Sequence, residues 1–79
     1  MTKTYFINLI SKRTRYALDH YSTATARITK KEFLRDGLTE LRLIEQIASD
    51  SDLSSKDMDI VYKVIKSDME TLRSLRSAI

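Results

Sequence analysis

Apolar residues recur every three or four positions in the last third of the chain, which is the spacing of one face of an α-helix. This stripe consists of Met58, Val61, Tyr62, Ile65, Met69 and Leu72. Ser54 precedes it as an N-cap residue with Asp57 three positions later, and Leu53 and Met58 can form a hydrophobic staple around that cap. The pattern predicts a helix from about residue 55 to residue 77.

A second stripe with the same spacing lies in the middle of the chain, at Leu34, Leu38, Leu41, Ile44, Ile47 and Ala48. Thr29 and Glu32 have the spacing of a capping box, and Ile28 and Phe33 could form its staple. We therefore expect a helix that is capped by Thr29 and ends near Ala48. Gly37 interrupts the stripe at a cost of about 1 kcal/mol relative to alanine. Either a neighbouring side chain packs closely there, or the glycine is simply tolerated.

The first segment is ambiguous between helix and strand. Residues 4–10 are rich in side chains that favour strands. The same region also fits helical spacing, through Phe6, Leu9, Ile10, Arg13, Tyr16, Ala17 and Tyr21. We favour a helix over residues 3–21, because a lone strand would find no partner within the chain. The alternative is an N-terminal strand that pairs with its own copy across a dimer axis.

The chain has no proline and a single glycine, which favours an all-α fold, because compact sheets need turn residues. We predict one domain over residues 1–79, a small three-helix arrangement. The short polar connection at residues 49–52 makes the last two helices an antiparallel hairpin.

The apolar stripe of the last helix looks too wide for so short a chain to cover. The sequence therefore predicts a homodimer in which this helix forms the interface. The interface candidates are Met58, Val61, Tyr62, Ile65, Met69 and Leu72.

Charge is distributed unevenly along the chain. The net charge is +3, but residues 1–36 carry +5 and residues 37–79 carry −2. Such asymmetry can indicate a surface for nucleic acid, and it also arises by chance on solvated helices. The candidate nucleic-acid contacts are Lys12, Arg13, Arg15, Arg27, Lys30, Lys31 and Arg35.

Residues suited to catalysis or metal binding are scarce. There is no cysteine, and His20 is the only histidine, expected at the surface or in an interface. Asp50 and Asp52 begin like a calcium loop, but Val61 stands where that loop needs a glutamate. We expect no enzyme activity, no cofactor, no metal and no small-molecule substrate. No apolar run reaches the ~20 residues of a membrane span, and a cytoplasmic location is expected.

Two functional hypotheses follow. The first is a small regulatory adaptor or inhibitor, without enzyme activity, that covers a site on a protein partner through its helices. The alternative is a DNA-binding transcriptional regulator that uses the basic N-terminal half.

Overall fold

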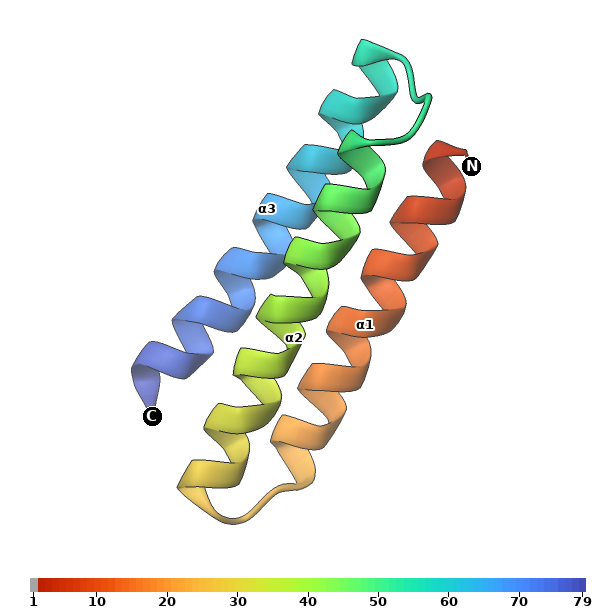
Figure 1. The fold of residues 1–79 in the computed structure, drawn as a ribbon. Helices are drawn as coiled ribbons and strands as arrows, with labels where there is room; N and C mark the ends of the chain where they lie inside the picture. The colour runs from red at the N-terminus through yellow and green to blue at the C-terminus, as the bar shows by residue number, and fades with distance from the viewer. Residues whose placement is uncertain (1) are drawn as a thin grey trace.

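A computed structural model describes residues 2–79 as three long α-helices joined by two short connections. They are α1 (Lys3–Thr23), α2 (Arg27–Ser49) and α3 (Ser55–Ala78). The helices lie side by side, and α2 runs antiparallel to both α1 and α3 (Figure 1). The Cα trace measures 42 × 18 × 15 Å. The predicted all-α fold with its C-terminal helical hairpin is confirmed, and residues 4–10 are helical rather than extended.

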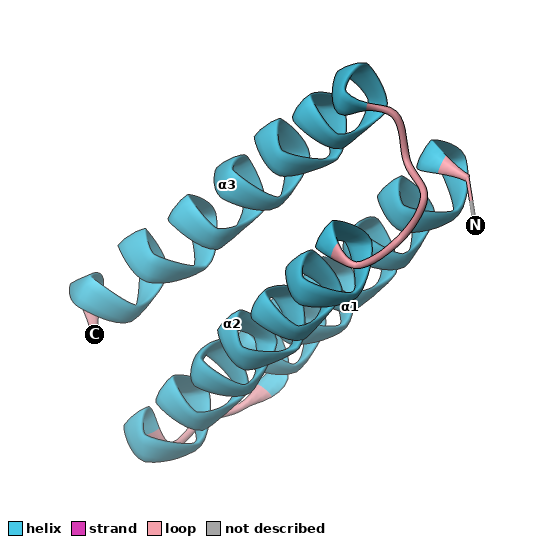
Figure 2. Ribbon diagram, turned by 45° about the horizontal axis from the view of Figure 1, so that its top comes forward, coloured by secondary structure: helices cyan, strands magenta, loops and turns pink. Residues whose placement is uncertain are grey.

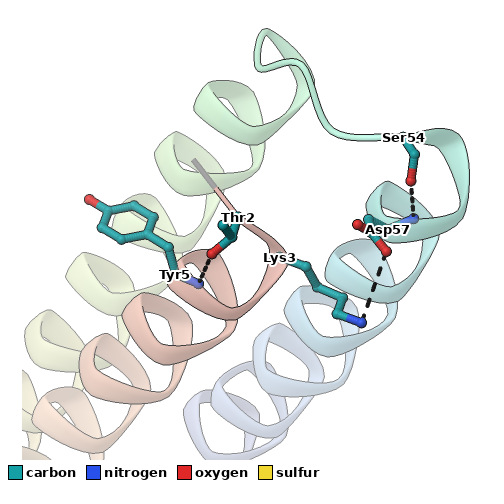
Figure 3. Close-up of polar contacts among 5 residues, drawn as sticks. All are labelled: Thr2, Lys3, Tyr5, Ser54 and Asp57. Atoms are coloured by element: carbon teal, nitrogen blue, oxygen red, sulfur yellow. Dashed lines mark hydrogen bonds and ion pairs between the residues drawn. The ribbon is translucent and has the colours of Figure 1, made fainter.

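Hydroxyl side chains cap the N-terminal ends of α1 and α3. The Thr2 hydroxyl accepts a hydrogen bond from the backbone N–H of Tyr5 at 3.2 Å. Ser54 accepts one from the N–H of Asp57, also at 3.2 Å, as the sequence predicts. These two ends meet where the Lys3 ammonium lies 3.9 Å from a carboxylate oxygen of Asp57 (Figure 3). Because both partners are largely solvated, this ion pair contributes little to stability.

The start of α2 differs from the prediction. The helix begins at Arg27, and its N-cap is Ala26, which has no side chain to accept a hydrogen bond. Thr29 lies inside the first turn, and Ile28 is 69% exposed, so neither the capping box nor the staple forms. The backbone carbonyl of Ala26 accepts from the N–H of Lys30 at 3.0 Å. An extended Thr29 cap would forfeit this first helical bond.

Each helix contributes residues at spacings of three or four to one apolar core. Figure 2 shows the backbone that carries it, three helices joined by short loops. Its largest fully buried side chains are Phe6, Ile10, Leu34, Leu41, Val61, Ile65 and Leu72. The one polar residue among the buried positions of residues 2–79 is Thr14, whose hydroxyl donates to Asp68 on α3 at 2.8 Å. This bond ties α1 to α3 halfway along the bundle.

Four of the six residues expected at a dimer interface belong to this core. Val61, Ile65 and Leu72 have no exposed surface, and Met69 keeps 7%. Met58 packs against the core's edge, while Tyr62 is 39% exposed. The premise that the chain is too short to cover this stripe is wrong, because α1 and α2 together bury it within one molecule.

Candidate binding surfaces

An open groove of about 660 Å³ lies between α2 and α3 and is lined mainly by cationic side chains. We call it the cationic groove. Its lining residues are Ile28, Lys31, Glu32, Arg35, Leu38, Arg42, Arg73, Arg76 and Ser77. Five of these side chains are cationic and one is acidic, so the lining has a net charge of +4.

The helical repeat and the antiparallel hairpin together gather these cations. On α2, Lys31, Arg35 and Arg42 recur at spacings of four and seven, which keeps them on one edge of the helix. Arg73 and Arg76 follow Leu72, whose methyl group lies close to Gly37. That contact fixes the register, so the first half of α2 faces the last turns of α3.

Most of this charge is uncompensated. The Arg35 guanidinium lies 3.6 Å from Asp36, a pair in which both side chains are at least 60% exposed. Among the ion pairs of residues 2–79, none involves Lys31, Arg42, Arg73 or Arg76. Cations near the end of α3 complement the helix dipole, but Lys31 near the start of α2 opposes it. Helix stability alone therefore does not explain the cluster.

The seven predicted nucleic-acid contacts do not share one face. Only Lys31 and Arg35 line the cationic groove. Lys12 and Arg15 lie on the exposed surface of α1, and Arg27 is exposed at the start of α2.

The remaining two predicted contacts are engaged within the molecule. Arg13 pairs with Glu40 of α2 at 3.4 Å. The Lys30 ammonium donates to the carbonyl of Tyr21 at 2.7 Å and lies 4.6 Å from the centre of that ring. The structure therefore separates the basic residues that the N-terminal half holds together in sequence.

Sequence reasoning missed three of the five groove cations, namely Arg42, Arg73 and Arg76. The positions of Arg73 and Arg76 could also be explained by the dipole of α3, which favours cations near the end of a helix. The signal that could have found them is the predicted hairpin itself, because it places the end of the last helix beside the start of the preceding one.

A second surface lies on the opposite edge of α2, where that helix meets α1. We define the apolar face as Tyr5, Leu9, Tyr16, Leu43 and Ile47. Leu9 is half-buried, and the other four side chains are 50–54% exposed. Leu9 lines one depression with Leu43 and Ile47 and another with Tyr5, so these four side chains are continuous between the two helices. Tyr16 lines a third depression, which shares Arg13 with the first.

An aromatic stack extends this face toward the α1–α2 connection. The His20 ring lies 4.7 Å from Phe33 of α2, stacked at 18°, and 4.2 Å from Tyr16. His20 is half-buried, and its ring bridges the two helices.

Within residues 2–79, no three His, Cys, Asp or Glu side chains are grouped as a metal ion would require. None of the helices in this part of the chain has the length and apolarity to cross a membrane. No protein-family model matches the sequence, and neither a curated protein nor a solved structure gives a significant match.

Proposed function

We propose that this protein is a small regulatory adaptor or inhibitor, without enzyme activity, that binds an acidic amphipathic helix of a partner protein in the cationic groove. The observation that carries the proposal is the combination of five cations and a single acid in one groove with the exposed apolar side chain of Ile28, while Leu38 in the same lining is buried. Charge alone would attract any anion. Ile28, which is 69% exposed beside these charges, favours a ligand that also has an apolar side.

The geometry of the groove suits a helix. A groove between two helices can receive a third, amphipathic helix, whose side chains contact it at spacings of three or four residues. Lys31 and Arg42 are eleven positions apart, which is about 16 Å along α2. A partner helix lying along α2 with acids at spacings of four and seven would match Lys31, Arg35 and Arg42.

Nucleic acid fits the groove less well. No aromatic side chain lines it, so unpaired bases would find no stacking partner there. Its cations flank a hollow between two helices rather than the tip of a protruding helix, which is what enters the major groove of DNA. Duplex DNA is the ligand of the alternative hypothesis, so the binding test compares it with the acidic helix.

The test is a titration followed by fluorescence anisotropy, with three labelled probes. The first is a helical model peptide with leucines on one face and glutamates at spacings of four and seven. The second is the same peptide with glutamine for glutamate, and the third is a 20-base-pair DNA duplex. We expect saturable binding of the acidic peptide and at least tenfold weaker binding of the glutamine peptide.

A charge-matched pair of variants locates the site. Arg35→Glu with Arg73→Glu should weaken peptide binding at least tenfold. Lys56→Glu with Lys63→Glu makes the same change in net charge at exposed positions in the first half of α3, outside the groove lining, and should weaken it less than threefold. Circular dichroism should show equal helix content in both variants.

Two results would overturn the proposal. One is equal weakening by the two variants, because binding would then depend only on net charge. The other is salt-sensitive DNA binding without peptide binding, which would favour the DNA-binding regulator.

A further inference from the structure

The apolar face between α1 and α2 holds most of the exposed large hydrophobic side chains of the described residues. Among residues 2–79, six large hydrophobic side chains are substantially exposed, and four of them are Tyr5, Tyr16, Leu43 and Ile47. Figure 3 shows the Tyr5 ring projecting from α1 on the side away from Lys3 and α3. Contiguous exposed apolar patches of this kind mark interaction sites, whereas scattered apolar residues do not.

One cation and one anion lie at the centre of the face, and Lys12, Arg15 and Asp19 at its border bring the net charge of these five side chains to +1. Arg13 and Glu40 form an ion pair across the two helices, with their side chains 49% and 38% exposed. They line the same depression as Leu9, Leu43 and Ile47. The centre of the face therefore offers both a cation and an anion to a partner, unlike the cationic groove with its lining of +4.

Such a face is complementary to itself. A two-fold axis brings each patch against its own copy, so the Arg13 of one molecule can approach the Glu40 of the other. The apolar side chains on both sides of this pair would then pack against the same set in the second molecule. The cationic groove has the opposite property, because two copies of a +4 lining repel each other.

The apolar face is only part of one long side of the molecule. That whole side measures at most 42 × 18 Å on the Cα trace, or about 750 Å². Specific protein interfaces bury about 800 Å² per partner, so a dimer here would also use the polar border of the face. Lys12, Arg15 and Asp19 border Tyr16 and would form the polar rim that such interfaces have.

We infer that the apolar face binds a second copy of this chain, giving a symmetric dimer through α1 and α2. The interface differs from the one expected from sequence, which used the apolar stripe now found in the core. The cationic groove lies between α2 and α3 and stays open in this dimer. Each dimer would present two grooves, and a partner with two acidic segments would then bind with increased avidity.

Sedimentation equilibrium of the full chain between 1 and 100 µM tests the inference. We expect a mass approaching twice the 9.2 kDa of one chain at the upper concentrations. Leu43→Glu and Ile47→Glu should each raise the dissociation constant at least tenfold, since both positions are half-exposed and tolerate the change in the monomer. Ile28→Glu makes the same change at an exposed site off the face and should leave it unchanged.

A charge-swap experiment tests whether Arg13 of one molecule contacts Glu40 of the other, in addition to the ion pair that the two residues form within each molecule. Arg13→Glu leaves two acids on the face, and Glu40→Arg leaves two bases. Each variant alone should dimerise at least tenfold more weakly than the natural chain. When they are mixed, the opposite faces should pair, and native mass spectrometry of the mixture should show the heterodimer in excess.

The inference is wrong if the natural chain remains monomeric at 100 µM. It is also wrong if Leu43→Glu and Ile28→Glu have equal effects, or if the mixed charge variants pair only statistically. The proposed function is tested by peptide affinity in the groove, so the two can fail independently.

Discussion

A methyl group on Gly37 of α2 would lie 2.8 Å from the Cβ of Ala17 on α1. It would also lie 3.0 Å from a methyl carbon of Leu72 on α3. Gly37 is helical and has no positive φ, so its role is not conformational. The absence of a side chain allows the three helices to approach one another here.

Gly37→Ala should therefore destabilise the fold, although alanine is the better helix former. Overpacking a core typically costs about 1–3 kcal/mol. The gain in helix propensity offsets about 1 kcal/mol of that. We expect a net loss of about 1 kcal/mol or more in the free energy of unfolding, measured in urea.

A double-mutant cycle with Ala17→Gly identifies the cause. That change removes the Cβ atom nearest to position 37, so Gly37→Ala should cost less in its presence. Equal costs in both backgrounds would show that Ala17 is not the obstacle.

Helix capping gives a second prediction, in which two similar positions behave differently. Ser54→Ala removes the acceptor for the N–H of Asp57 and should cost about 1 kcal/mol. Thr29→Ala should be neutral or slightly stabilising, because Thr29 lies within α2 and caps nothing. Urea unfolding of both variants checks this, and an equal loss at Thr29 would place the start of α2 later than the structure does.

The contrast between Ser54 and Thr29 shows which features of this fold could be predicted from sequence patterns. Hydrophobic spacing predicted all three helices to within about three residues, because burying an apolar stripe is the main source of helix stability in so small a fold. The capping box at Thr29 was wrong because local side-chain signals are worth only about 1 kcal/mol. The helical backbone bond from Lys30 to Ala26 outweighs such a signal.

The binding surfaces were harder to predict, because they depend on which helix edges meet. The basic residues of the N-terminal half are close in sequence but point to different sides of the bundle. Arg73 and Arg76 are more than thirty positions from Arg35, and only the hairpin brings them together. Tertiary register is fixed by contacts such as that of Gly37 with Leu72, which periodicity does not encode.

The hydrogen bond between α1 and α3 supplies a third prediction. Thr14→Val keeps the shape of the side chain but removes the donor to Asp68. Because Asp68 is only half-buried, water can replace part of that bond, and we expect a loss of about 1 kcal/mol. Thr39→Val is the matched control, since its hydroxyl bonds to its own helix at an exposed position. Comparable losses in the two variants would mean that the bond across helices contributes nothing of its own.

The last prediction concerns two adjacent lysines of α2 that sequence reasoning treated alike. The Lys30 ammonium caps the carbonyl of Tyr21 and lies over its ring, so it joins the end of α1 to the start of α2. Lys30→Met keeps the aliphatic stem and removes both contacts, which should cost about 1–2 kcal/mol in unfolding free energy. Lys31→Met removes a cation from the crowded groove and should leave stability unchanged or slightly raise it.

Ligand binding should show the reverse order of the two variants. The acidic peptide should lose more affinity to Lys31→Met than to Lys30→Met. If Lys30→Met is the variant that weakens binding while stability is unaffected, then its ammonium faces the ligand rather than Tyr21, and the division of the basic residues between structural and binding roles is wrong.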